Sequence, residues 1–269
     1  MNLIQEVVKS RYDIRDFTIK EEKTFPETFS LEVEVPVKNQ GSKPTCVAHA
    51  LSSVIEYHHK KQHQNYLEFS TEFIYGLREG DYHYGDGMCI RDGLNTIQKY
   101  GDTLESDCAG NHNYETARKK VRSNIDELKE LAYPNRVSSY FKITTAEGIK
   151  TALMKYGVVV VGMYSYHKSK LVDDVYTYDT SKGYGAHCVF IYGWNEKGWL
   201  TQNSWGKSYG GDGRFIIPFD FKFFEMWGVV DNITEGDLNK PKRNKVLDFI
   251  YLIINKLVNL FLTIKENAR

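Results

Sequence analysis

The pattern of apolar residues changes near residue 135, and this change constrains the fold of the 269-residue chain more than any other feature. Before it, apolar residues recur at helical spacing, as they do at positions 47, 50, 51, 54 and 55 of the segment 46–61. After it, short apolar runs such as 158–166 and 186–194 are typical of buried strands. A helix-rich half followed by a strand-rich half predicts an α+β protein with two lobes.

The sequence predicts five segments and the helices within them. The segments are an N-terminal arm packed on the surface (1–30), a helical lobe (31–135), a β-rich lobe (136–230), a polar basic linker (231–245) and a C-terminal apolar helix (246–269). Besides the helix that starts at residue 46, helices are expected at 70–79 with Ser70 as cap, 90–100, 115–132 and 144–157.

Composition excludes several classes of function. The net charge of +0 gives no electrostatic case for nucleic acid. Four cysteines without any CxxC pair argue against a disulfide scaffold and against a zinc site, and we expect no metal and no cofactor. The first residues lack the apolar run of a secretory signal, so a cytoplasmic location is predicted.

Cys46 is expected at the first position of a helix, with Thr45 as its cap. The helix dipole and the unpaired N–H groups at such a position favour a thiolate, which is the nucleophilic form of cysteine. A buried structural cysteine is the commoner outcome, so Cys46 alone does not establish catalysis.

Three further residues fit a catalytic group with Cys46. Gln40 lies six residues earlier on a loop and can donate an amide N–H to an oxyanion, with the Cys46 backbone N–H as second donor. His187 is expected at the beginning of one strand and Asn203 at the end of the next. Two antiparallel strands with this spacing can bring the two side chains together.

These segments resemble the papain-like cysteine peptidases. VKNQGSKPTCVAHA is similar to that family's VKNQGxCGSCWAFA, and GAHCVFIYGW followed by WLTQNSWGKSYGGDGRFII is similar to its HAVxxVGYG and WxxKNSWGxxWGxxGYxxI stretches. The resemblance covers roughly residues 30–230. It implies a two-lobe papain-like fold, with a helical lobe, a β-barrel-like lobe and the active site in the cleft between them.

The resemblance also implies roles for individual residues. Cys46 and His187 form a thiolate–imidazolium pair that attacks a peptide carbonyl, and Gln40 helps to stabilise the oxyanion. Asn203 fixes the imidazole, while Trp205 shields their hydrogen bond; simple core packing is the other interpretation of this tryptophan.

Departures from the family pattern point to bacterial or viral members rather than lysosomal ones. Lys43 stands where the family usually has a cysteine, so a characteristic disulfide cannot form, and Val47 replaces a tryptophan. Only 45 residues precede Cys46, so either activity is controlled without a long prodomain or the arm does part of that work.

The substrate site is predicted from GDGMCIRDGLNTIQKYG, which resembles the family's Gly-rich substrate-binding segment. Gly87, Met88, Cys89 and Ile90 are expected to edge the site for the substrate backbone and the P2 side chain, the second residue before the cleaved bond. Ala186 is expected to line the same pocket. These residues favour a hydrophobic P2 side chain, unless some of them only pack the lobe.

The apolar run 246–264 follows a cluster of basic residues at 240–245. This combination fits a helix on a membrane surface, and Asp248, Asn255, Lys256 and Asn259 make a full span less favourable. Docking on the peptidase body, on a partner protein or on a second copy is the alternative for residues 240–264.

Three functions are compatible with these residues. The first is hydrolysis of peptide bonds by a cysteine endopeptidase that takes peptides or proteins as substrates. The second is acyl transfer to an amine by the same residues. The third is a binding module without catalysis, against which the intact Gln40, Cys46, His187 and Asn203 argue.

Overall fold

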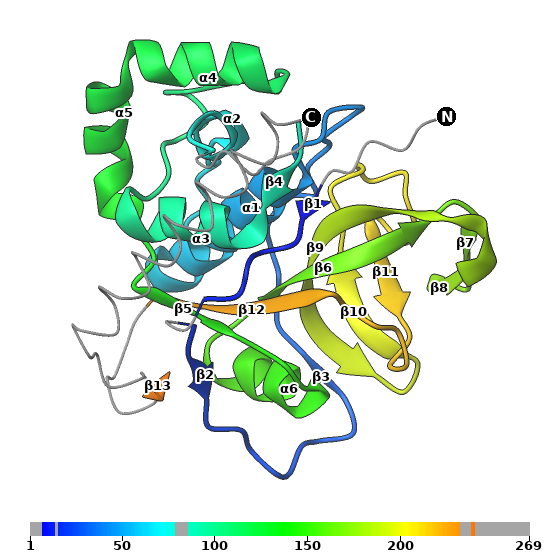
Figure 1. Cartoon of the computed structure of the whole chain (residues 1–269). Coiled ribbons are helices and arrows are strands. Elements are labelled where there is room, and N and C mark those ends of the chain that lie inside the picture. The colour runs from blue at the N-terminus through cyan, green and yellow to red at the C-terminus, as the bar shows by residue number, and fades with distance from the viewer. Residues whose placement is uncertain (1–6, 14–15, 79–85, 232–237, 240–269) are drawn as a thin grey trace, which may run out of the picture.

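Helices and strands are segregated along the chain, as the two kinds of apolar pattern require (Figure 1). The computed structural model describes residues 7–13, 16–78, 86–231 and 238–239. The helices are α1 (Cys46–His63), α2 (Thr71–Gly76), α3 (Ile90–Lys99), α4 (Tyr114–Ser123), α5 (Ile125–Ala132) and α6 (Ala146–Lys155), with 3-10 turns η1 (Tyr133–Asn135) and η2 (Thr180–Lys182).

The strands of the second half form one large sheet. It contains β5 (Ser139–Lys142), β6 (Val159–Tyr166), β7 (Ser169–Val172), β8 (Val175–Tyr178), β9 (Tyr184–Asn195), β10 (Gly198–Gln202), β11 (Arg214–Ile217) and β12 (Glu225–Val230). Their order is β5-β12-β6-β9-β10-β11-β8-β7, and β3 (Phe29–Ser30) adds to β9. Neighbours pair antiparallel except β11 and β8, which pair parallel. The predicted α+β class is confirmed.

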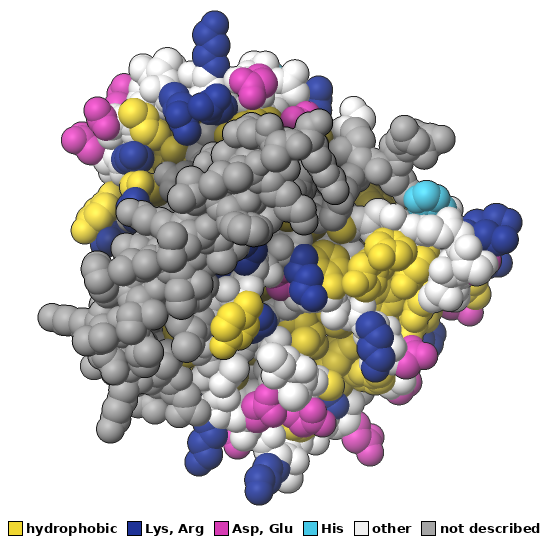
Figure 2. All heavy atoms as spheres, viewed as in Figure 1, with side chains coloured by type: hydrophobic (Ala, Val, Ile, Leu, Met, Phe, Trp, Pro, Cys, Tyr) yellow, Lys and Arg dark blue, Asp and Glu magenta, His cyan; other side chains and the backbone are white. Residues whose placement is uncertain are grey.

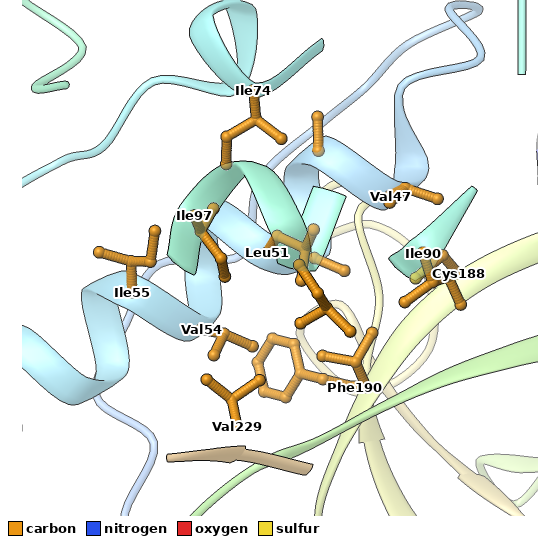
Figure 3. Packing of buried hydrophobic residues seen from close by; sticks show 14 of the residues in the cluster. Val47, Leu51, Val54, Ile55, Ile74, Ile90, Ile97, Cys188, Phe190 and Val229 are labelled. Atoms are coloured by element: carbon orange, nitrogen blue, oxygen red, sulfur yellow. The ribbon is translucent and has the colours of Figure 1, made fainter. Parts of the chain in front are cut away.

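The two lobes meet through a core that α1 and α3 share with the sheet. Figure 3 shows Leu51 and Val54 of α1 facing Phe190 and Val229 of the sheet. Cys46 belongs to this same buried cluster. A second cluster lies inside the β lobe and is covered by α6, and a third joins α2, α4 and α5. Each buried methylene group stabilises the folded state by about 0.8 kcal/mol. The first cluster draws its residues from both lobes and therefore holds them together.

The helix predictions need two corrections. The expected helix 115–132 is broken at Asn124, whose φ of −130° and ψ of 34° are not helical, so the chain turns there from α4 into α5. The expected helix 70–79 ends at Gly76, with Leu77 as its C-cap. His58, near the end of α1, is buried. Burial lowers the pKa of His58 to about 3. Ser70 does cap α2, because its hydroxyl accepts the N–H of Phe73.

The arm is more ordered than the sequence suggested. Its described residues include three short strands. β1 (Val7–Val8) pairs with β4 (Met88–Cys89), and β2 (Thr18–Ile19) pairs with β13 (Leu238–Asn239). β3 pairs with β9. These strands are only two residues long, which is too short for the alternation that marks a strand in a sequence. The arm therefore joins both lobes rather than lying on one surface.

The predicted C-terminal helix lies outside the described residues, so its membrane and docking roles stay predictions. Among the residues that the structure describes, no helix has the length and apolar character to cross a bilayer.

Candidate active site

His187 and Asn203 lie side by side on antiparallel strands, as their spacing predicted. His187 is in β9, Asn203 directly follows β10, and the Nε2 atom of His187 is 2.8 Å from Oδ1 of Asn203. The same oxygen accepts the backbone N–H of Ser204 at 2.8 Å, which fixes the amide plane. Because an amide oxygen accepts, Nε2 must carry the proton of this bond. The asparagine therefore sets both the orientation and the tautomer of the ring.

Trp205 packs on the imidazole that makes this hydrogen bond. Its ring stacks on the imidazole of His187 with 4.4 Å between centroids and 23° between planes. Tyr209 packs against the indole at right angles, with 4.8 Å between centroids. Trp205 is half-buried, while His187 and Asn203 are only 2% and 4% exposed. The stacked indole and the hydrogen bond to Asn203 together restrict rotation of the imidazole.

Cys46 is the first residue of α1, the predicted place for a nucleophile. No acidic residue stands in the first turn of this helix to oppose a thiolate. Thr45 holds the cap position, but its hydroxyl donates to Oδ1 of Asn111 at 3.2 Å instead of bonding the helix. Cys46 is fully buried in the core between the lobes, together with Cys188, the neighbour of His187 in β9.

Gln40 links the loop before the nucleophile to the segment that carries Asn203. Its backbone N–H donates to the carbonyl of Ser204 at 2.8 Å, and the Ser204 hydroxyl donates to its Oε1 at 2.7 Å. Its Nε2 donates to the carbonyl of Lys43 at 2.8 Å, which uses one of the two N–H bonds of a primary amide. Gln40 is 1% exposed. The two sequence blocks that suggested a common site are thus hydrogen-bonded to each other.

The predicted substrate segment is covered by the N-terminal arm. Gly87 is buried, Met88, Cys89 and Ile90 are fully buried, and the strand β4 pairs in parallel with β1. Ala186 is half-buried and packs against the same core. Its register partner Tyr164 belongs to an aromatic group on the β lobe, where Figure 2 shows hydrophobic side chains gathered at the surface.

A group of charged residues around the middle of α1 was not anticipated. The Nζ atom of Lys38 lies 2.7 Å from Oε1 of Glu56, whose side chain is fully buried. Burial raises the pKa of Glu56 to about 7, and it raises the pKa of the fully buried Asp102 well above its usual range. Nothing in the sequence signals such a group, because its members are spread over sixty residues and meet only in the folded chain.

The four cysteines are free thiols, in agreement with the missing disulfide position at Lys43. Burial raises the pKa of Cys89 and of Cys108 to about 11 and that of Cys188 well above the usual range. These three thiols are therefore poor nucleophiles at neutral pH. Within the described parts of the chain, no group of three or more His, Cys, Asp or Glu residues could hold a metal ion.

A two-lobe fold with a cysteine at a helix N-terminus in one lobe and a His–Asn pair in the other defines the class of thiol peptidases. Comparison with known proteins agrees. The model of the papain family cysteine proteases matches residues 26–223, which is well over half of the chain. The chain therefore belongs to the papain family and is a cysteine-type peptidase that takes peptides or proteins as substrates.

A viral relative matches nearly the whole chain, and a bacterial cysteine protease shares its fold. An uncharacterized peptidase C1-like protein of Acanthamoeba polyphaga mimivirus is 26% identical over 92% of this chain and 93% of its own. The cathepsin B-like cysteine proteinase 3 of Caenorhabditis elegans is 38% identical over 30% of this chain and 24% of its own. Xylellain, a cysteine protease from Xylella fastidiosa, has the same fold, with a TM-score of 0.74, 22% identity, and coverage of 84% of this chain and 96% of its own.

Proposed function

We propose that this chain is an endopeptidase in which Cys46 is the nucleophile, His187 the general base and acid, and Asn203 the residue that orients the imidazole. The observation that carries the proposal is the 2.8 Å hydrogen bond between Nε2 of His187 and Asn203, under the stacked ring of Trp205. A histidine held in this way by its far nitrogen is preorganised to exchange a proton through Nδ1.

The proposed reaction has two steps. In the first, Nδ1 of His187 takes the thiol proton, the Cys46 sulfur attacks the peptide carbonyl, and the same proton passes to the leaving amine, which leaves an acyl-enzyme. In the second, a water molecule gives a proton to His187 and attacks the thioester, so that the acid product leaves and the thiol is restored. Each step needs the imidazole to shuttle one proton, which explains why its orientation is fixed so firmly.

The oxyanion of each tetrahedral intermediate is proposed to lie between the backbone N–H of Cys46 and the side-chain amide of Gln40. As the first residue of α1, Cys46 has a backbone N–H at a helix N-terminus, and these groups point along the helix axis away from its body. Gln40 is fixed by its bonds to Ser204 and Lys43, so its amide needs no reorganisation during the reaction. Loss of one such donor typically costs about 100-fold or more in kcat.

The test is cleavage of a peptide library by the wild type and by Cys46→Ala, with the cut sites mapped by mass spectrometry. We expect cleavage to disappear in the variant while the circular dichroism spectrum and melting temperature stay close to those of the wild type. Cys188→Ala is the matched control, because it removes a buried cysteine from the same core. Equal cleavage by wild type and Cys46→Ala would refute the assignment of the nucleophile.

A further inference from the structure

The turn that leads into Cys46 is closed by two hydrogen bonds of its own. The N–H of Lys43 donates to the carbonyl of Gln40 at 3.2 Å, and Nε2 of Gln40 donates to the carbonyl of Lys43 at 2.8 Å. Because Lys43 stands where the papain family usually has a cysteine, no disulfide ties this turn to the rest of the helical lobe. The separation of Gln40 from Cys46 therefore depends on non-covalent contacts.

Asn111 bridges the two ends of this turn. Its Nδ2 donates to the carbonyl of Gln40 at 2.9 Å, and its Oδ1 accepts the hydroxyl of Thr45 at 3.2 Å. Because a carbonyl oxygen can only accept, the nitrogen of the Asn111 amide must face Gln40. Thr45 directly precedes Cys46 and is 2% exposed. One planar amide thus contacts the residue that bears the first proposed oxyanion donor and the neighbour of the residue that bears the second.

The backbone on both sides of Gln40 is fixed by hydrogen bonds. Its carbonyl accepts the backbone N–H of Lys43 and the side-chain amide of Asn111, which together use both lone pairs of the oxygen. Its backbone N–H donates to the carbonyl of Ser204. These bonds set the direction in which the side chain of Gln40 leaves the backbone, so loss of Asn111 weakens the hold on the peptide that leads toward Cys46.

Carboxylates hold the backbone on both sides of Asn111. The N–H of His112 donates to Oε2 of Glu72 at 3.1 Å, and the imidazole bonds to Oε1 of the same carboxylate through Nδ1. Glu72 belongs to α2 and is 1% exposed. On the other side, the N–H of Gly110 donates to Oε1 of Glu105 at 3.1 Å. The side chain of Asn111 is itself exposed, so its replacement leaves the packing of the core unchanged.

We propose that Asn111 is a positioning residue for the oxyanion donors, which holds Gln40 and Thr45 at the separation that the tetrahedral intermediate requires. This inference rests on the proposed function, in which the amide of Gln40 and the backbone N–H of Cys46 stabilise the oxyanion. Such donors are effective only in the correct geometry, and a misplacement of about 1 Å can cost about 100-fold in rate. Asn111 acts through its two partners and lies outside the segments that made the family recognisable.

The first test compares the steady-state kinetics of the wild type, Asn111→Ala and Asn113→Ala in the full-length chain, on a peptide that the wild type cleaves. Both steps of the proposed reaction pass through a tetrahedral intermediate, so Asn111→Ala should lower kcat about 10- to 100-fold and change KM less than about 2-fold. Asn113 is an exposed asparagine two residues away that caps α4, and its replacement should leave kcat unchanged. An equal kcat in the two variants, or a loss mainly in KM, would overturn the inference.

A double-mutant cycle tests the bond between Asn111 and Thr45. Thr45→Val keeps the size of the side chain but removes the hydroxyl, so it should also lower kcat, and Thr45→Ser should recover most of that loss. Asn111→Ala and Thr45→Val break the same hydrogen bond, so the double variant should lose less than the product of the two single factors. Losses that multiply would show that the two residues act independently and would contradict the bridge.

Alkylation of Cys46 by iodoacetamide separates failure of this inference from failure of the proposed function. The thiolate displaces iodide from a saturated carbon, so a sulfur–carbon bond forms without any oxyanion. Cys46 of Asn111→Ala should therefore be alkylated within about 2-fold of the wild-type rate, although its kcat is lowered.

A parallel fall of alkylation and kcat would show that Asn111 supports the thiolate rather than the oxyanion donors, which would overturn this inference while the nucleophile stands. A wild type that cleaves no peptide and is not alkylated at Cys46 would refute the proposed function, and the inference with it.

Discussion

The ammonium of Lys38 forms ion pairs with two carboxylates. Oε1 of Glu56, whose side chain is fully buried, lies 2.7 Å from Nζ. Oε1 of Glu68, whose side chain is 58% exposed, lies 3.8 Å from it. Glu56 also accepts the backbone N–H of Phe69 at 3.0 Å. These bonds hold the start of α2 and the loop before Cys46 against the middle of α1. Desolvation of the buried carboxylate nevertheless outweighs these bonds, so the pKa of Glu56 is raised to about 7.

This raised pKa predicts how stability depends on pH. In the unfolded chain Glu56 loses its proton near its usual pKa of 4.5, whereas in the folded chain it keeps the proton up to about pH 7. The folded state binds more protons between these values, so the free energy of unfolding falls as pH rises through this window. At 1.36 kcal/mol per unit, the contribution of Glu56 is about 3 kcal/mol. Urea unfolding of the wild type and of Glu56→Gln at pH 4.5 and pH 8 measures it, because other titrating groups such as His58 contribute to both proteins alike.

Glu56→Gln should remove most of this loss, because glutamine resembles the protonated acid at every pH. Glu68→Gln, which changes the exposed partner of the same lysine, should leave the pH dependence as in the wild type. If Glu56→Gln lost as much stability as the wild type between the two pH values, the raised pKa would be wrong.

The role of Asn203 gives a prediction on activity. Asn203→Ala should lower kcat/KM about 100-fold, because the imidazole loses the bond that sets its plane and tautomer, and small misplacements of a catalytic group carry penalties of this size. Asn113→Ala is the control: Asn113 caps α4 by accepting the N–H of Thr116, so its loss costs about 1 kcal/mol of stability far from His187. The prediction fails if the two variants reduce activity by the same factor after correction for the folded fraction.

Much of this site could be predicted from sequence because its chemistry lies at strand and helix ends. The spacing between His187 and Asn203 corresponds to one antiparallel turn, and Cys46 follows a loop that contains Gly41 and Pro44. The arm could not be predicted in the same way, since Val7 pairs with Met88 and Ser10 bonds Glu225, 215 residues further along the chain, without any periodic signal. Long-range pairings of short strands depend on the finished shape of both lobes rather than on local propensity.

The reactivity of the thiols should separate Cys46 from the other three cysteines. At pH 7.5 a thiol with a pKa of about 11 is ionised to less than about one part in a thousand, so Cys89 and Cys108 should resist iodoacetamide in the native protein. We expect one modified cysteine, at residue 46, in the native protein and four in urea. Native modification that persists in Cys46→Ala would show that another thiol is the reactive one.

Gly93 gives a prediction on packing beneath the site. It lies in α3, and a Cβ atom at this position would be 2.3 Å from Cδ1 of Leu51, 3.2 Å from Cε of Met88 and 3.4 Å from Cγ1 of Val47. In an open helix the change from glycine to alanine stabilises by about 1 kcal/mol. Here the contact with Leu51 should outweigh that gain, because overpacking of a filled core costs about 1 to 3 kcal/mol.

Gly93→Ala is therefore expected to lower the free energy of unfolding, and Leu51→Val should offset part of this loss by shortening the side chain that the new methyl group meets. The double variant should then be more stable than the sum of the two single changes predicts, since the residues are in contact. Lys99→Ala on the exposed side of α3 should change stability by less than about 0.5 kcal/mol. Additive single and double variants in urea unfolding would mean that α3 moves away from α1 instead of pressing on Leu51.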